Sequence, residues 1–154
     1  MKVLKTPEER FQNLKDFNFK ENFFYVTHEN QKIRMHYLDE NSDSDEVVLL
    51  LHGEPTWCYL YRHIIPILTK AGKRVIAPDL IGFGKSDKLA EKSNYSYANH
   101  IDWVTQLFNH LVLNNVILFA QDWGGLIGLR LLTASPEKFS GLVASNTGLP
   151  IGKG

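Results

Sequence analysis

Cysteine is almost absent from this chain of 154 residues, because Cys58 is the only one. A single cysteine cannot form a disulfide within the chain, which fits a reducing compartment. The sequence also lacks any run of about 18 consecutive apolar residues, the length that a membrane-spanning helix needs. Its first residues, MKVLKTPEERF, contain no apolar stretch of the kind found in signal peptides. We therefore expect a soluble, cytoplasmic chain with no membrane partner.

An excess of one charge is also lacking, because 17 Lys and Arg residues balance 17 Asp and Glu residues. A neutral chain has no electrostatic reason to bind nucleic acid, and we expect no such partner. Hydrophobic residues make up 44% of the chain and charged residues 22%, which is ordinary for a globular protein. No linker, internal repeat or low-complexity segment divides the sequence. We therefore expect residues 1–154 to form part of one core domain.

Two kinds of strand pattern are present. Apolar residues at Ile33, Met35 and Tyr37 alternate with polar ones, which indicates a half-exposed antiparallel strand near an edge of a sheet. Its hairpin partner is expected at 23–28, turned through positions 28–31. The continuous apolar runs at 47–51 and 116–120 indicate parallel strands that are buried on both faces. Shorter strands are expected at 74–77 and around 142–144.

Helical spacing of apolar residues marks three further segments. The first runs from Leu60 to Leu68 and contains Pro66, which predicts a kink or a helix that begins later than Leu60. The second runs from 97 to 111, with Ser96 as its N-cap. The third begins at Leu126, after two glycines. Two strands followed by strand–helix repeats predict an α/β fold, with a mostly parallel sheet and helices on both faces.

Asp122 is a charged residue at the end of a buried strand, where an unpaired charge is costly. The sequence around it, AQDWGG, has small residues at 120, 124 and 125. This is the pattern of a nucleophile elbow, a tight strand-to-helix turn that exposes its central side chain. We expect an ionised Asp122 that is held by helix amides and presented to a pocket. The simpler alternative is a capping Asp at an ordinary strand–helix turn.

A second motif, LHGEPTW at 51–57, directly follows the buried strand at 47–51. Its place resembles the oxyanion loop of α/β-hydrolases, in which the backbone N–H groups of Glu54 and Trp123 would converge on the oxygen of a bound ester. We expect His52 to be a structural histidine that satisfies backbone groups of the loop, rather than a catalytic base. Trp57 is expected to contribute packing.

A third motif, APDLIGFGKSD at 77–87, invites comparison with phosphate-binding loops. Both glycine patterns fail on spacing, because Asp79 and Asp87 stand where glycines would be needed. We therefore interpret the segment as a structural loop that follows a strand.

Together, HGEPTW, GFGKSD and QDWGG resemble the haloalkane dehalogenases of the α/β-hydrolase superfamily, from about Phe23 to Asn146. The resemblance implies that Asp122 is the nucleophile that displaces halide from carbon and forms an aspartyl ester. It implies that Trp123 donates its indole N–H to the halide, and that Glu54 lies near the halide and the hydrolytic water. The implied partners are a haloalkane, water and the halide product, with no cofactor and no metal.

The hydrolytic step of this chemistry needs a histidine base and an acid that follow the nucleophile in the chain. No histidine follows His110, and Glu137 is the only acid after Asp122. The segment from 148 to 154 is typical of a loop that leaves a strand. We therefore expect the N-terminal half of a dehalogenase, without the helical cap, and expect these residues alone to be inactive in steady turnover.

Two alternatives stay open. QDWGG is shared with epoxide hydrolases, although Glu54 favours the dehalogenase, and epoxide opening would need tyrosine acid donors from the cap. A non-catalytic α/β-hydrolase-like binding module would keep the elbow and lack the histidine base.

Overall fold

A computed structural model describes residues 1–149; positions 150–154, most of the loop predicted at 148–154, lie outside the described residues. Short 3-10 helices occupy Glu8–Phe11, Cys58–Tyr61, Lys92–Asn94 and Pro136–Lys138. The three α-helices are α1 (Ile64–Lys70), α2 (Tyr97–His110) and α3 (Trp123–Ala134). The strands are β1 (Val3–Leu4), β2 (Glu21–His28), β3 (Gln31–Glu40), β4 (Val47–Leu51), β5 (Arg74–Pro78), β6 (Lys88–Leu89), β7 (Val116–Gln121) and β8 (Phe139–Ser145).

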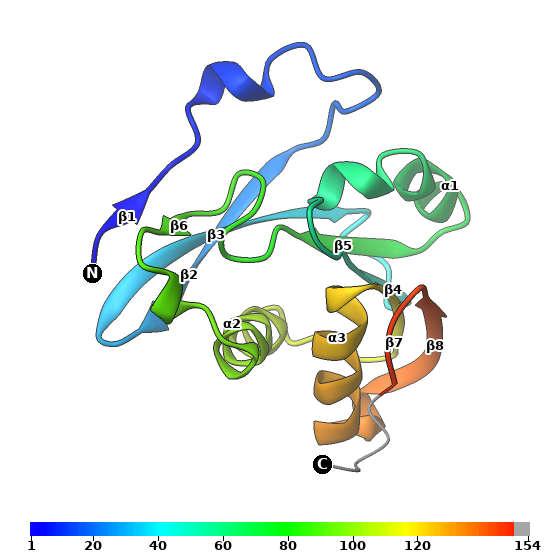
Figure 1. The fold of residues 1–154 in the computed structure, drawn as a ribbon. Coiled ribbons are helices and arrows are strands. Elements are labelled where there is room, and N and C mark those ends of the chain that lie inside the picture. The colour runs from blue at the N-terminus through cyan, green and yellow to red at the C-terminus, as the bar shows by residue number, and fades with distance from the viewer. Residues whose placement is uncertain (150–154) are drawn as a thin grey trace.

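Six of the strands form one mixed sheet in the order β2-β3-β5-β4-β7-β8, whereas β1 and β6 form a small separate pair (Figure 1). β4 pairs in parallel with both β5 and β7, and β7 pairs in parallel with β8. β2 and β3 are antiparallel, as the alternating pattern predicted. The predicted α/β fold is therefore confirmed.

Helices cover both faces of the sheet, with α2 and α3 on one face and α1 on the other (Figure 1). The continuous apolar run of β4 has its explanation here. Val47, Leu49 and Leu51 pack in the cluster on the α2–α3 face. Val48 and Leu50 pack with α1 on the opposite face. Successive side chains of a strand point to opposite faces, so a strand covered on both sides must be apolar throughout.

The prediction of a half-exposed strand around 33–37 is wrong in part. The face with Ile33 and Met35 is buried as expected, but His36 and Leu38 on the other face are also fully buried. Leu38 packs in the cluster on the α1 face. His36 is buried by the loop that follows β5, which lies along β3. The backbone N–H of His36 donates to Ser86 Oγ at 2.8 Å. An alternating pattern shows which face of a strand is apolar, but it does not show whether a distant loop covers the other face.

α1 begins later than Leu60, as one of the two alternatives for Pro66 predicted, whereas α3 begins earlier than expected. α1 begins at Ile64, so Pro66 lies in its first turn, where a backbone N–H would have no acceptor within the helix. α3 begins at Trp123 and includes the two glycines that were expected to precede it. The predicted cap of α2 is confirmed, because Ser96 Oγ accepts a hydrogen bond from the N–H of Asn99 at 3.1 Å. Within residues 1–149, no helix has the length and apolar character that crossing a membrane requires.

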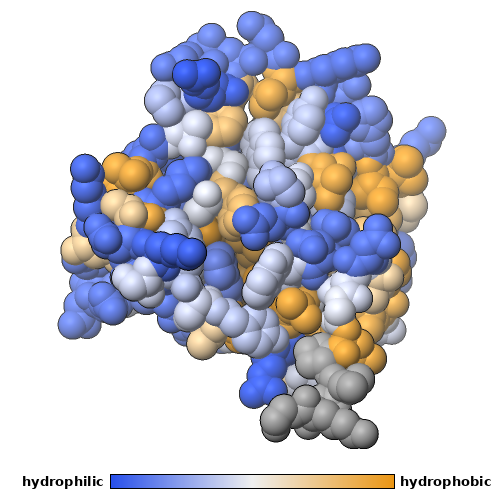
Figure 2. Space-filling model, in the orientation of Figure 1, coloured by the Kyte–Doolittle hydropathy of each residue, from blue (hydrophilic) through white to orange (hydrophobic). Residues whose placement is uncertain are grey.

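β8 lies at one edge of the sheet and carries exposed apolar side chains. Leu142 and Val143 are each 45% exposed. Apolar side chains gather on the side of the molecule where α1 and β8 lie (Figure 2). An edge strand with an apolar surface is a template for pairing with another chain.

We expect a polypeptide of residues 1–154 to self-associate through β8. Val143→Lys places a charge on this edge and should raise the concentration at which half of the chains associate about tenfold, equivalent to ~1.4 kcal/mol. Leu4→Lys is the matched control, because Leu4 is 44% exposed but lies in the small β1–β6 pair. Light scattering across a concentration series measures the effect. Equal association of the wild-type, Val143→Lys and Leu4→Lys chains would contradict a role for β8 in association.

Candidate active site

The turn between β7 and α3 is as tight as the sequence predicted. Asp122 has φ 55° and ψ −124°, a backbone conformation that residues other than glycine seldom adopt. α3 starts directly against the end of β4, because a Cβ atom at Gly124 would lie 2.3 Å from the carbonyl oxygen of Leu51. Ala120 at the end of β7 is fully buried. Small side chains at these positions are therefore a steric requirement of the turn.

The carboxylate of Asp122 is held by the loop after β4 and not by the helix amides that were expected. Its Oδ1 accepts a hydrogen bond from the backbone N–H of Glu54 at 2.9 Å. The side chain makes no capping hydrogen bond to the amides of α3, so the expectation that helix amides hold it is wrong. A Cβ atom at Gly53 would lie 2.3 Å from Asp122 Cβ. The carboxylate thus lies against the backbone of the loop after β4, and only glycine permits that approach.

The topology brings the three sequence motifs together. HGEPTW follows β4, QDWGG follows β7, and GFGKSD follows β5, and these three strands are neighbours in parallel. The carboxyl ends of parallel strands meet at one edge of the sheet, which is where ligands bind in open α/β folds. Residues that are far apart in the chain therefore share one site.

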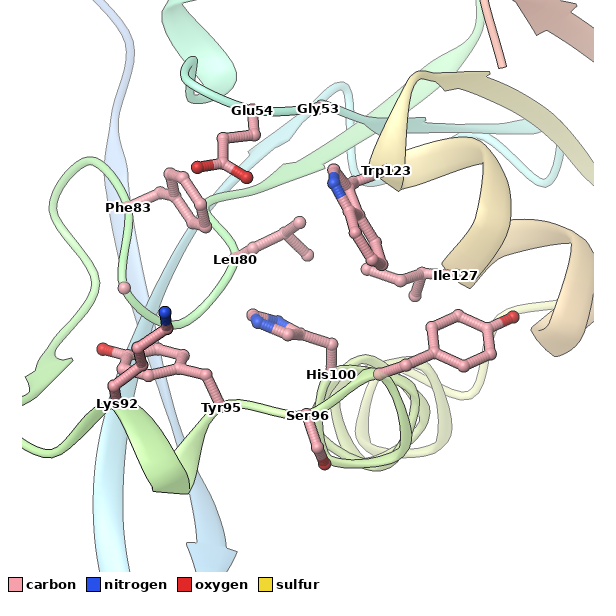
Figure 3. A pocket seen from close by; sticks show the side chains of 12 residues that line it. Gly53, Glu54, Leu80, Phe83, Lys92, Tyr95, Ser96, His100, Trp123 and Ile127 are labelled. Carbon is pink, nitrogen blue, oxygen red and sulfur yellow. The ribbon is translucent and has the colours of Figure 1, made fainter. Parts of the chain in front are cut away.

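A cavity of about 480 Å³ opens beside this turn, with both Glu54 and Trp123 among its lining residues (Figure 3). Asp122 is not itself a lining residue. Leu80, Phe83 and Ile127 supply apolar wall. Leu80, Phe83 and His100 lie between the Glu54–Trp123 side and the 3-10 helix at 92–94 (Figure 3). The cavity is thus mostly apolar, with a carboxylate and an indole at one side.

Trp123 and Glu54 both remain accessible. Trp123 is 43% exposed. Its ring packs against that of Tyr97 on α2, with 6.4 Å between the two ring centroids. Glu54 is exposed beside it. The structure therefore places all three residues predicted from the sequence around one point, although their chemical roles stay predictions.

His100 is a cavity residue that the sequence reasoning missed. It projects from α2 into the cavity, and its Nδ1 is buried with no hydrogen-bond partner among residues 1–149 (Figure 3). Burial, with a smaller effect of His52, lowers the pKa of the His100 imidazole to about 4. The ring is therefore neutral at pH 7. Its spacing of three residues from Tyr97 was the available signal, because both then lie on one face of a helix.

His52 has the structural role that was expected. Its Nδ1–H donates to the carbonyl oxygen of Gly53 at 2.8 Å, and its Nε2 accepts from the N–H of Leu80 at 2.9 Å. Both ring nitrogens are engaged, and burial lowers the pKa of the imidazole. Trp57 packs among the rings of Phe11, Phe17 and Tyr59, as expected for a packing residue.

The loop at 79–87 holds a buried hydrogen-bonded network, as expected for a structural loop, and its Leu80, Gly82 and Phe83 also line the cavity. Asp79 is fully buried and accepts hydrogen bonds from His36 Nδ1 at 2.9 Å and from the N–H of Cys58 at 2.9 Å. The N–H of Lys85 donates to the same carboxylate at 2.8 Å. Burial alone would raise the pKa of Asp79, but the hydrogen bond and charge of His36, with smaller contributions from His52 and Cys58, lower it.

The same three buried side chains have the atom types of metal ligands. His36, Cys58 and Asp79 bring ligand atoms within 4.8 Å of one another. However, both oxygens of Asp79 already accept hydrogen bonds, and burial raises the pKa of the Cys58 thiol well above its usual value. A protonated thiol is a poor metal ligand. The cluster is best described as a hydrogen-bonded network.

Comparison with known proteins agrees with this geometry. Residues 46–152 match the family described as alpha/beta hydrolase fold. A haloalkane dehalogenase of Psychrobacter cryohalolentis is 55% identical over 153 residues, which are 99% of this chain and 50% of that protein. The tetrameric haloalkane dehalogenase of Paraglaciecola agarilytica NO2 has a similar structure, with a TM-score of 0.94 and 45% identity, over 99% of this chain and 52% of that one.

A mutant epoxide hydrolase of Vigna radiata is more distant, with a TM-score of 0.68 and 32% identity, over 81% of this chain and 38% of that one. The predicted resemblance to haloalkane dehalogenases is thereby confirmed. The chain spans about half the length of the curated relatives it matches.

The lowered pKa of His100 predicts a pH dependence of stability. The unfolded chain takes up a proton on this histidine as the pH falls below 6.5, whereas the folded chain does so only near pH 4. The unfolded state is therefore favoured progressively between pH 6.5 and 4, by up to about 3 kcal/mol, with no effect above that window. NMR titration of the imidazole and urea unfolding of His100→Gln test this. An imidazole that titrates near 6.5 would contradict the prediction.

Proposed function

This chain belongs to the alpha/beta hydrolase fold family, and we propose that its protein hydrolyses carbon–halogen bonds of haloalkanes through an ester on Asp122. The observation that carries the proposal is the contact of Asp122 Oδ1 with the N–H of Glu54, beside Trp123 and a mostly apolar cavity. An apolar cavity suits a haloalkane, and a carboxylate is a nucleophile that needs no base at pH 7.

The first step is displacement of halide. With Oδ1 held by Glu54, the other carboxylate oxygen, Oδ2, attacks the carbon that carries the halogen. A carbon–oxygen bond forms, and the carbon–halogen bond breaks with its electron pair on the halide. The indole N–H of Trp123, a donor with no acceptor role, stabilises the negative charge that develops there. The product is an alkyl ester of Asp122.

The second step is hydrolysis of that ester. Water attacks the carboxyl carbon of Asp122, and the negative charge passes to Oδ1, where the N–H groups of Glu54 and Trp123 form the oxyanion hole. Collapse of this intermediate breaks the bond between the carboxyl carbon and the alkyl oxygen, and the alkoxide takes a proton to become the alcohol. We propose that the side chain of Glu54, which lines the cavity, binds this water.

A base must accept a proton from the attacking water. His52 has both nitrogens engaged, and His36 is buried against Asp79. Within residues 1–149, His100 is the histidine that lines the cavity, and its low pKa makes it a weak base. Because the chain spans about half of its relatives, we infer that a histidine and an acid outside residues 1–154 supply this step.

Epoxide hydrolysis is a weaker alternative. Opening an epoxide needs an acid that protonates the ring oxygen, and two tyrosines line the cavity. The hydroxyl of Tyr97 donates to the carbonyl oxygen of Leu126 at 2.8 Å, and that of Tyr95 accepts from the N–H of Leu89 at 2.6 Å. The proton of Tyr97 is thus engaged with a backbone carbonyl, whereas the Tyr95 hydroxyl is an acceptor whose pKa is raised by burial, which weakens it as an acid. Assays of the whole protein with a haloalkane and with an epoxide separate the two reactions, because only the first releases halide.

The proposal includes three further predictions from the sequence. They are a location in the cytoplasm, a single core domain, and a reaction that uses no cofactor or metal. A non-catalytic binding module is the remaining alternative, and formation of a covalent ester distinguishes it from an enzyme.

We expect 1-bromohexane to alkylate Asp122, with no more than one equivalent of bromide released per chain of residues 1–154. Asp122→Asn should abolish the mass increase. Asp102→Asn, an exposed acid on α2, is the matched control and should react as wild type does. Intact-mass and peptide-mapping mass spectrometry locate the adduct. An ester on another residue, or no ester at all, would refute Asp122 as the nucleophile. Many turnovers by residues 1–154 would refute the inference that the base lies outside them.

We expect Trp123→Phe to slow this alkylation about 10²–10³-fold, the effect of losing one donor worth ~2.7–4 kcal/mol to a developing anion. Trp57→Phe is the control, because Trp57 lies in the aromatic cluster away from the cavity. Single-turnover bromide release measures both rates. Equal rates for the two variants would show that the Trp123 indole only packs.

A further inference from the structure

The backbone at Asp122 needs support from its surroundings. A residue other than glycine in this conformation costs about 1–3 kcal/mol and persists only where neighbouring contacts hold it. Its N–H donates to the carbonyl oxygen of Ser145 at 3.3 Å. Its own carbonyl oxygen accepts from the N–H groups of Gly125 at 2.9 Å and Leu126 at 3.4 Å, which are the first bonds of α3.

One side chain also binds this carbonyl oxygen. The hydroxyl of Thr147, just beyond the end of β8, donates to the carbonyl oxygen of Asp122 at 2.7 Å. Among the bonds to this peptide group it is the shortest. Thr147 also lies tightly over the first turn of α3, because a Cβ atom at Gly125 would lie 2.0 Å from Thr147 Oγ1. Gly125 is therefore needed for Thr147 to reach the carbonyl.

The bond to Thr147 also orients an N–H group. The peptide between Asp122 and Trp123 is planar and trans, so its C=O and N–H point in opposite directions. Thr147 holds the carbonyl of Asp122 along α3. The N–H of Trp123, on the opposite side of the same peptide, therefore points out of the N-terminus of the helix. The first N–H groups of a helix have no acceptor within it and are free to bind an anion.

We infer that Thr147 is a positioning residue: by fixing the peptide between Asp122 and Trp123, its hydroxyl aims the N–H of Trp123 at Asp122 Oδ1, where the oxyanion forms. This inference rests on the proposed ester chemistry. The N–H of Glu54 donates to Oδ1 from the loop after β4. The Asp122 carboxylate makes no capping bond to α3 in this structure, so we expect the N–H of Trp123 to join Glu54 only when charge gathers on Oδ1 as the oxyanion forms. Thr147 acts on ester hydrolysis, in which the charge on Oδ1 grows, and little on halide displacement, in which the charge leaves the carboxylate.

The test separates these two steps on residues 1–154. Asp122 is alkylated with 1-bromohexane, the excess is removed, and hydroxide-driven loss of the ester at alkaline pH is followed by mass spectrometry. Thr147→Val should slow ester loss at least about tenfold, short of the ~10²–10³ expected for deleting an oxyanion donor, and leave the alkylation rate within about threefold. Thr147→Ser keeps the hydroxyl and should restore ester loss. Thr133→Val, which removes a hydroxyl bonded to the carbonyl of Arg130 elsewhere on α3, should change neither rate.

A second measurement needs no haloalkane. The residual dipolar coupling of the Trp123 N–H reports its direction, and should change in Thr147→Val but not in Thr147→Ser or Thr133→Val. An unchanged coupling, unchanged ester loss, or an equal slowing of alkylation and ester loss would each overturn the inference. Absence of any ester in the wild-type chain would instead overturn the proposed function, while the coupling still decides whether Thr147 orients this N–H.

Discussion

The register between β4 and β7 is the constraint on which the site depends. The two strands pair in parallel from Val47 opposite Val116 to Leu51 opposite Ala120, so both chains leave the sheet at the same level. Glu54 and Asp122 therefore meet across 68 residues of sequence, with 2.9 Å between N and Oδ1. A slip of one residue would turn every side chain of a strand to the other face. The close approach of Gly124 to the carbonyl oxygen of Leu51 fixes the end of β4 against the start of α3 and so opposes such a slip.

Close backbone approach is the second requirement, and it explains the small residues of the motifs. The Asp122 side chain lies on the backbone at Gly53, and the start of α3 lies on the end of β4 at Gly124. These contacts hold a strained residue in place because the elements around it are themselves packed in the core. The strained backbone thus presents one carboxylate oxygen to the N–H of Glu54, and in the proposed mechanism the other oxygen attacks the haloalkane.

The loop after β5 braces the loop after β4. Leu80 donates its N–H to His52, and Asp79 accepts from the N–H of Cys58, so the first residue of HGEPTW and the residue directly after the motif are both tied to one buried loop. Buried polar groups are tolerated where each finds a partner, and such networks limit movement. The loop after β5 therefore supports the site through Asp79 and Leu80, and its Phe83 also supplies part of the apolar cavity wall.

The sequence by itself determined the elements that depend on local pattern. The α/β fold followed from the apolar runs, the tight turn between β7 and α3 from the small residues around Asp122, and the α2 cap from Ser96. The likeness to haloalkane dehalogenases followed from three short motifs. Such features are set by neighbours in the chain, so a sequence states them directly.

Only the tertiary structure decided which groups meet. The partner of the Asp122 carboxylate proved to be the N–H of Glu54 and not the amides of α3. His36 is buried by a distant loop, in which Ser86, 50 residues further along the chain, accepts a hydrogen bond from the N–H of His36. His100 enters the cavity, and Thr147 reaches the Asp122 carbonyl across 25 residues. Each of these contacts joins segments whose separation is set by strand order and register, and neither a period nor a motif contains that information.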